Sequence, residues 1–331
     1  MRRRDFIKGI AGSATVWPLT AHAQQPSGPP RIGLVMGYDQ ESAEAQSLVT
    51  AFRDGLEKLG LRDGHEIKID YRWVGTTDTT RAQQVTQELV ALRPDLIVSS
   101  GSPTTVLLRR ETKTIPIIFV QVVDPVAQGF ADSLSRPGGN ATGTANFEAS
   151  MAGKWIDLLK SVSPQLTKLV IPFNPASAPY ADIYLKSFKS IAPSLGVEVV
   201  APAIVDLAAL DSFCAAQVKD ASTAAIPMPS GIFSGHVREL ATIMVRHRLP
   251  SLYVLRAYAE AGGLLSYGND IRENFRTAAT FVDRILKGEK PSELPIQFPT
   301  NFELAVNVKT AKQLGLHIPQ QLLAAADEVI E

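Results

Sequence analysis

The residue types that most often carry catalysis are few in this sequence, and their spacing does not suit it. Beyond residue 23 the histidines are His65, His236, His247 and His317. None lies in HExxH or another metal-ligand spacing, so a surface or helix-end position is the simpler interpretation for each. No G-x-S-x-G elbow, Walker A loop or G-x-G-x-x-G fingerprint is present. We therefore expect a protein that is not an enzyme and that uses no cofactor or metal.

Polar and aromatic residues that suit reversible binding follow the predicted strands in the first half of the chain. They are Gly37, Tyr38, Ser100, Gly101, Ser102, Thr104, Gln121 and Asp124. The unpaired amides of a helix start hold a carboxylate or phosphate well, and Ser102 and Thr104 lie at such a start. Simple N-capping explains these two residues equally well. Tyr38 can stack on an apolar or aromatic ligand or pack between loops.

Two of these residues sit around the end of one buried strand. Gln121 is polar inside an otherwise apolar run, so its amide needs a partner. Asp124 precedes Pro125, and the X-Pro step ends the strand there. Asp124 can pair with a ligand ammonium group or simply form an Asp-Pro turn.

The second half of the chain offers a smaller set of candidates. They are Asn174, Ser177, Tyr180, Met228, Tyr267 and Asp270. Asn174 can bind a ligand through its amide or start an Asn-Pro turn, and Met228 offers adaptable apolar surface. Tyr267 can line the floor of a cleft or pack near a hinge. For Asp270 we favour the N-cap of the helix that follows over a contact to a ligand ammonium group.

These residues must be positioned by an α/β framework, because strand and helix patterns alternate from residue 31 to residue 123. Strand patterns cover 31–36, 67–73, 96–98 and 117–123, and helical spacing covers 45–59 and 79–92. The almost wholly apolar run 117–123 is typical of a strand buried on both faces of a parallel sheet. We predict a doubly wound parallel sheet, which binds ligands at the carboxyl ends of its strands.

The same alternation restarts after residue 143, which predicts a second lobe. Helices are expected at 151–162, 179–195, 207–219 and 237–247, and strands at 168–171, 197–200, 224–226 and 251–254. The RPGGN segment at 136–140 is expected to carry the chain between the lobes. A second passage is expected at Gly262-Gly263, with a strand at 264–268 returning to the first sheet before a helix at 271–287. A third is expected at 291–299, ahead of a second-lobe strand at 302–308.

The first 23 residues have the features of an export signal. RRRDFIK at 2–8 is a twin-arginine type of n-region, residues 9–19 are modestly apolar, and Ala21-His22-Ala23 is a cleavage site. The apolar stretch is shorter than the about 20 residues that a membrane span needs. We expect cleavage after Ala23, with residues 24–30 as a Pro/Ser/Gly linker.

Composition after cleavage excludes nucleic-acid binding and favours two lobes. The chain has 33 basic and 33 acidic residues, and residues 1–23 hold four basic and one acidic, which leaves 29 basic, 32 acidic and a net charge of −3. That balance does not provide the excess of positive charge that binding to DNA or RNA requires. Cys214 is the only cysteine, so no intramolecular disulfide can form. The mature chain is longer than chains that usually fold around a single hydrophobic core.

Seven segments together carry a resemblance to a known family. They are TIPIIF at 114–119, DPV at 124–126, RPGGNATG at 136–143, GGLLSYG at 262–268, ILKGEKP at 285–291, FELAVN at 302–307 and AADEVIE at 325–331. In this order they resemble the periplasmic substrate-binding proteins of ABC importers, of the type described as tryptophan- or aromatic amino-acid-binding. The resemblance covers nearly the whole mature chain.

The resemblance implies a type I periplasmic binding fold: α/β, with two doubly wound parallel-sheet lobes joined by a hinge of three crossings. The expected N-terminal lobe is 31–143 plus 263–292, and the expected C-terminal lobe is 144–262 plus 293–331. Such a monomer captures a small ligand in the periplasm, here an amino-acid-like or aromatic carboxylate, and delivers it to an inner-membrane ABC permease. A sensing module for a receptor kinase or chemoreceptor, and a secreted enzyme on the same fold, remain alternatives.

Overall fold

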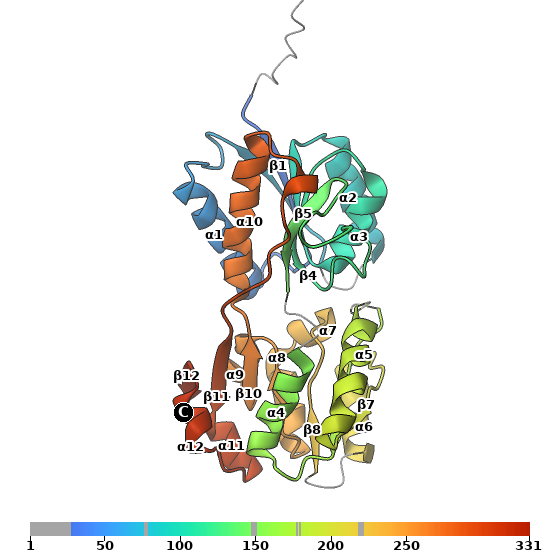
Figure 1. Ribbon diagram of the computed structural model, residues 1–331, viewed down its shortest axis with the longest axis vertical. Coiled ribbons are helices and arrows are strands. Elements are labelled where there is room, and N and C mark those ends of the chain that lie inside the picture. The colour runs from blue at the N-terminus through green and yellow to red at the C-terminus, as the bar shows by residue number, and fades with distance from the viewer. Residues whose placement is uncertain (1–27, 76–78, 147–150, 177, 179, 218–221) are drawn as a thin grey trace, which may run out of the picture.

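Two α/β lobes, one above the other, form the molecule, and three segments of chain connect them (Figure 1). This computed structural model describes residues 28–331 except 76–78, 147–150, 177, 179 and 218–221. The expected leader at 1–23 and Ser177 therefore lie outside the described residues. The predicted fold class is confirmed: both lobes are α/β, with mainly parallel sheets.

The first lobe contains a five-stranded sheet with the order β2-β1-β3-β4-β5, in which every pair is parallel. Its strands are β1 (Arg31–Met36), β2 (Lys68–Trp73), β3 (Leu96–Ser100), β4 (Ile117–Val122) and β5 (Ala141–Ala145). Its helices are α1 (Ala43–Lys58), α2 (Thr79–Ala91), α3 (Ser102–Glu111) and α10 (Ile271–Leu286). Helices α1 and α10 cover one face, and α2 and α3 cover the other (Figure 1).

Successive side chains of the central strands enter different hydrophobic cores. Val98 of β3 packs in the cluster that contains Phe52 of α1 and Phe275 of α10. Its neighbour Ile97 points to the opposite face and packs in the cluster that contains Leu108 of α3. Each of these side chains is fully buried, which stabilises the fold by about 1.5–3 kcal/mol per side chain. This two-sided burial explains why the strands read as continuous apolar runs.

The second lobe repeats the architecture with shorter strands. Its strands are β6 (Lys168–Val170), β7 (Glu198–Val200), β8 (Thr223–Ala225), β9 (Leu252–Tyr253), β10 (Leu265–Gly268), β11 (Glu303–Asn307) and β12 (Glu328–Ile330). Its helices are α4 (Ala152–Val162), α5 (Ala181–Ile191), α6 (Leu207–Gln217), α7 (Gly231–Ser234), α8 (Val237–Arg246), α9 (Arg256–Glu260), α11 (Val308–Leu314) and α12 (Gln320–Ala324).

Two groups of strands form the sheet of this lobe, β7-β6-β8 and β12-β11-β10-β9. A parallel bridge between Ala225 and Ser251 joins them. Every described pair is parallel except β10 with β11, which is antiparallel because β11 enters from the third connection. Trp155 of α4 lies at the centre of one core, stacked on Phe188 with ring centroids 5.9 Å apart.

Two expected passages between the lobes are wrong. Segment 136–140 connects β4 to β5 inside the first lobe, and the chain crosses only after β5. The expected return strand at 264–268 does not join the first sheet, because β10 pairs with β9 and β11 in the second lobe. Glycine and proline predict an interruption but not which sheet the next strand joins. The second crossing therefore follows Gly268 and leads directly into α10.

The third connection stays with the first lobe for longer than expected. The backbone N–H of Gln297 donates to the carbonyl of Gly143 at 3.0 Å, and the N–H of Ala145 donates to the carbonyl of Gln297 at 2.9 Å. The first and third connections therefore run side by side as they leave this lobe. The chain then enters β11, which lies in the second-lobe sheet, as predicted.

The packing of Gly268 provides a test of the corrected strand pairing. A Cβ atom at this position would lie 1.8 Å from the carbonyl oxygen of Val254, which follows β9. We expect Gly268→Ala to lower the free energy of unfolding by about 2 kcal/mol or more, because the obstacle is backbone. Urea denaturation of the purified protein measures the change.

Gly153→Ala is the matched control, because its new Cβ would make an ordinary contact at 3.6 Å with Ile191. We expect it to be neutral or slightly stabilising, since alanine is favoured over glycine inside a helix by about 0.5–1 kcal/mol. Equal stability of Gly268→Ala and the wild type would show that β10 does not lie against Val254.

Candidate functional site

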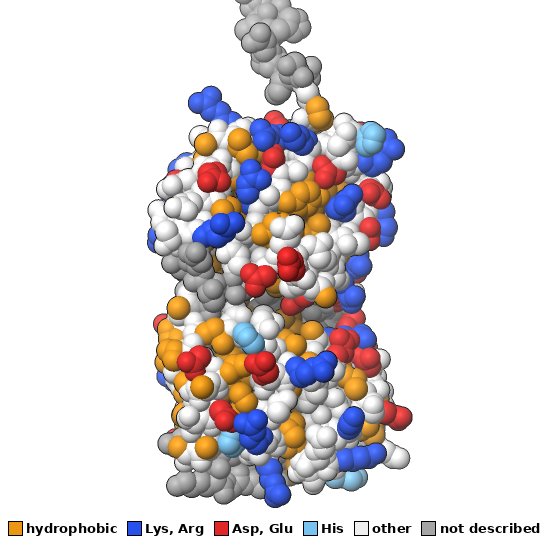
Figure 2. Space-filling model, turned by 180° about the vertical axis from the view of Figure 1, so that it is seen from behind, with side chains coloured by type: hydrophobic (Ala, Val, Ile, Leu, Met, Phe, Trp, Pro, Cys, Tyr) orange, Lys and Arg blue, Asp and Glu red, His pale blue; other side chains and the backbone are white. Residues whose placement is uncertain are grey.

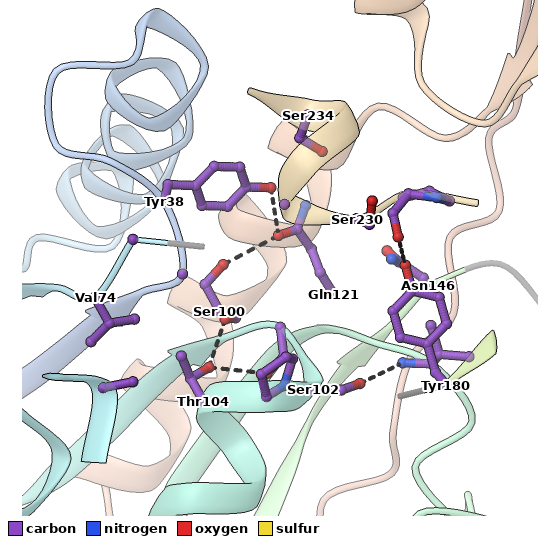
Figure 3. A pocket seen from close by; sticks show the side chains of 18 of the residues that line it. Tyr38, Val74, Ser100, Ser102, Thr104, Gln121, Asn146, Tyr180, Ser230 and Ser234 are labelled. Carbon is purple, nitrogen blue, oxygen red and sulfur yellow. Dashed lines mark hydrogen bonds between the residues drawn. The ribbon is translucent and has the colours of Figure 1, made fainter. Parts of the chain in front are cut away.

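A cavity of about 290 Å³ lies between the two lobes. It is lined by Gly37, Tyr38, Val74, Gly75, Ala82, Ser100, Gly101, Ser102, Pro103, Thr104, Leu107, Gln121, Val123, Asn146, Ala176, Tyr180, Pro229, Ser230, Gly231, Ser234, Leu255 and Ile271. Most of these residues follow the carboxyl ends of parallel strands, where open α/β sheets bind ligands. Figure 3 shows side chains from both lobes pointing towards this space.

Eight residues predicted to bind a ligand line the cavity: Gly37, Tyr38, Ser100, Gly101, Ser102, Thr104, Gln121 and Tyr180. Five others do not: Asp124, Asn174, Met228, Tyr267 and Asp270. The first group lies after β1, from the end of β3 into the start of α3, within the last residues of β4, and at the start of α5. The second group has other partners within the fold.

The two predicted carboxylates of the second group have local roles. Asp124 accepts a hydrogen bond from the N–H of Ala127 at 2.9 Å, so it forms the turn that the Asp-Pro pattern also allowed. Asp270 accepts from the N–H of Arg272 at 3.0 Å and caps α10, as favoured from the sequence. It also forms an ion pair with the Arg272 side chain. Neither carboxylate faces the cavity.

The remaining three are held by packing or by backbone groups. The amide of Asn174 donates to the carbonyl of Ile204 at 2.8 Å, so it serves the second-lobe loops. Met228 is fully buried in the second-lobe core. Tyr267 stacks on Phe302 with ring centroids 5.8 Å apart. For these residues, tertiary neighbours decide between alternatives that the sequence left open.

Gln121 connects three of the cavity residues. Its Oε1 atom accepts one hydrogen bond from the Tyr38 hydroxyl at 3.2 Å and one from the Ser100 hydroxyl at 3.2 Å (Figure 3). Its backbone has φ of +62°, and the register of β4 with β5 shifts between Phe119 and Val122. Non-glycine residues rarely adopt this conformation, and such outliers gather at functional sites.

The start of α3 forms a second part of the wall. Gly101 is the N-cap residue and has no side chain with which to cap the helix, so the alternative that Ser102 serves as the N-cap is wrong. The Ser102 hydroxyl accepts instead from the Gln128 amide at 3.0 Å. The Thr104 hydroxyl donates to the carbonyl of Ser100 at 2.6 Å. First-turn amides of a helix have no partner within it, so this end offers N–H donors.

The second lobe contributes a turn at 229–231 that follows β8. The Tyr180 hydroxyl donates to the carbonyl of Pro229, which connects α5 to this turn. Ser230 is only 5% exposed, and its hydroxyl has no hydrogen-bond partner among the described residues. The three residues 229–231 line the cavity, whereas the predicted Met228 just before them packs in the core.

Sequence reasoning missed several apolar lining residues and also polar ones, Asn146 and Ser234 among them. The apolar ones include Val74, Leu107, Leu255 and Ile271. Their types are those of any core residue, so no local pattern marks them. Asn146 was missed because the first crossing was expected before β5, and the true crossing puts this residue at the cavity.

Uncharged groups line the cavity among the described residues, since none of those side chains is Asp, Glu, Lys, Arg or His. Burial raises the pKa of Tyr38 and of Tyr180 well above the ordinary value, so both hydroxyls remain protonated at neutral pH. In the part of the chain that the structure describes, no group of three or more His, Cys, Asp or Glu is placed to hold a metal ion. The described lining residues therefore offer hydrogen bonds and apolar contact to a ligand.

Comparison with known proteins decides the family. A sequence model of the family described as ABC transporter substrate binding protein matches residues 41–330. The chain belongs to this family. Its members are solute-binding proteins, typically periplasmic or extracellular, that bind small ligands and work with ABC permeases.

Relatives of the chain include a protein named for its ligand. The tyrosine-binding protein of Clostridioides difficile (strain R20291) is 26% identical over 265 residues, which are 80% of this chain and 75% of that protein. It is similar along most of its length, so the match is not confined to one lobe.

Two solved structures have the same fold. The ABC domain from Streptococcus pneumonia, solved in complex with L-Trp, is 23% identical, with a TM-score of 0.83 over 92% of this chain and 100% of that one. A conserved domain protein from Vibrio cholerae O1 biovar El Tor N16961 is 24% identical, with a TM-score of 0.83 over 91% of this chain and 100% of that one. The fold is thus the type I periplasmic binding fold.

The two buried serines of the site should respond to substitution in opposite directions. We expect Ser230→Ala to raise the free energy of unfolding of the ligand-free protein by about 1 kcal/mol, because it removes a buried hydroxyl that has no partner. Ser100→Ala should lower it by about 1 kcal/mol, because Gln121 loses a donor. Urea denaturation of both variants checks the pair, and a loss of stability in Ser230→Ala would contradict the assignment.

Proposed function

We propose that this protein captures a small solute in the periplasm and delivers it to an ABC permease in the inner membrane. The observation that supports this most directly is the cavity between the lobes, which receives residues from the carboxyl ends of strands in both sheets. A ligand there contacts both lobes at once. It therefore stabilises the closed arrangement without undergoing any reaction.

The lining supports a ligand that has an apolar body and an oxygen-rich head group. The rings of Tyr38 and Tyr180 and the apolar side chains around them suit an aromatic or aliphatic portion. The start of α3 offers N–H donors, which favour a carboxylate. An amino-acid-like or aromatic carboxylate fits both parts, and two of the similar proteins are named or described with L-Trp or tyrosine.

The three connections let the lobes rotate as rigid bodies about a hinge. A ligand shifts the equilibrium between the open and closed forms of such a hinge only by as much as it binds the closed form more tightly. A micromolar dissociation constant corresponds to about 8 kcal/mol. A few hydrogen bonds and one stacked ring in a dry cleft can provide that free energy.

The surface is compatible with a soluble carrier of this kind. In Figure 2, basic and acidic side chains are interspersed over both lobes on the face shown, with no field of a single sign. None of the helices among the described residues is long and apolar enough to cross a bilayer. Membrane association is proposed only through the permease, with the carrier itself a monomer.

The ligand class is tested by a thermal-shift screen of amino acids, aromatic acids, nucleosides and sugars. We expect amino acids or aromatic carboxylates to raise the melting temperature, since a ligand at 100 times its dissociation constant adds about 2.7 kcal/mol of stability. Small-angle scattering should show compaction with the same ligands. A response to sugars or metal ions alone would refute a carboxylate ligand.

Delivery of the ligand to the permease is checked separately, by ligand-dependent ATPase activity of the reconstituted permease.

Export is tested separately from binding. The leader at 1–23 lies outside the described residues, and its twin-arginine pattern supports transport of the folded protein. We expect the periplasmic protein to begin at Gln24, as measured by intact mass. The double substitution Arg3→Lys and Arg4→Lys should keep the precursor in the cytoplasm. Unchanged export of that variant would refute the twin-arginine route.

A further inference from the structure

Gln121 occupies its place because the backbone of β4 is bent there. Residues of a regular strand point alternately to the two faces of the sheet, where both neighbours of Gln121 are fully buried. The register shift between Phe119 and Val122, together with φ of +62° at Gln121, breaks that alternation at the carboxyl end of the strand. The side chain consequently lines the cavity.

The oxygen and the nitrogen of the Gln121 side-chain amide differ in their hydrogen bonding. Oε1 accepts from two hydroxyls, those of Tyr38 and Ser100, which together use both of its lone pairs. The nitrogen Nε2 has no hydrogen-bond partner among the described residues. A primary amide carries two N–H donors there, so the side chain offers donors and no free acceptor to the cavity.

The polar groups next to Gln121 also offer mainly hydrogen-bond donors to the cavity. The Ser102 hydroxyl accepts from Gln128 and from the N–H of Val123, so its own proton is left for donation. The start of α3 adds unpaired N–H groups. Tyr180 donates its hydroxyl proton to a backbone carbonyl and presents mainly its ring.

We propose that Gln121 sets the polarity of the ligand head group by presenting Nε2 donors to a carboxylate or carbonyl oxygen, so that the cavity selects an acid over the corresponding amine. This rests on the proposed solute-binding function and refines it. The hydroxyls of Tyr38 and Ser100 act as positioning groups, because both donate to Oε1 and thereby leave Nε2 towards the ligand.

Gln121→Glu provides an isosteric test. The glutamate still accepts from both hydroxyls, but it replaces the donors with an acceptor that carries a negative charge. The probes are 3-phenylpropionate and 2-phenylethylamine, which share a ring and chain and differ in the head group. Isothermal titration calorimetry at pH 7 gives both dissociation constants for each protein.

We expect the wild type to bind 3-phenylpropionate at least 10-fold tighter than 2-phenylethylamine. In Gln121→Glu the ratio of the two affinities should fall by about 100-fold, the size expected for loss of a hydrogen bond to a charged group together with a new like charge. A ratio of affinities is insensitive to a general loss of stability, because both probes bind the same folded fraction.

Two further variants separate the role of the amide from charge and from folding. Gln84→Glu makes the same chemical change on an exposed position of α2 and should leave the ratio unchanged. Gln121→Asn suits the left-handed backbone conformation and withdraws the amide by one methylene group. It should fold cooperatively, with a lower melting temperature because the bonds to Tyr38 and Ser100 are weakened, and lose about 10-fold in affinity for the acid.

The outcomes distinguish this inference from the proposed function. A wild type that binds the acid, with an unchanged ratio in Gln121→Glu, would refute the role of Gln121 while solute binding stands. Preference of the wild type for the amine would refute it as well. A wild type that binds neither probe and no other carboxylate would remove the proposed ligand class, and the inference with it.

Discussion

Parallel pairing with right-handed crossovers is the constraint on which the rest of this structure depends. It sends every strand of the first sheet, and all of the described strands of the second except β11 and β12, towards the same edge of its sheet. The loops that follow those strands are then neighbours, however distant they are in sequence. Tyr38, Ser100 and Gln121 come from three such strand ends and meet in one hydrogen-bonded group.

Burial on both faces is what makes this arrangement rigid enough to hold a site. Ile97 and Val98 are adjacent in β3 and enter separate cores, so the strand cannot shift without disturbing both. Two departures from regular backbone geometry lie at the carboxyl end of β4, where Gln121 and Asp124 have positive φ. Well-packed surroundings make such local strain tolerable, and it turns a polar side chain towards the cavity instead of the core.

The connections between the lobes are compatible with the proposed hinge. The first and third connections are hydrogen-bonded to each other at Gly143, Ala145 and Gln297 as they leave the first lobe. The second passes from β10 directly into the capped start of α10. The proposed hinge motion would therefore bend only the few residues between these well-packed bodies.

The sequence by itself determined the alternation of strand and helix, the two lobes and seven of the residues on the first-lobe wall. Local patterns are sufficient there, because a buried parallel strand is apolar and the turn after it is marked by glycine, serine or proline. Tertiary structure alone decided that β10 belongs to the second lobe, that Asn174 and Tyr267 have partners in distant segments, and that Asn146 reaches the cavity. Strand pairing and side-chain partners depend on contacts between distant segments, and a residue type or spacing does not encode which of two possible neighbours the fold will bring to it.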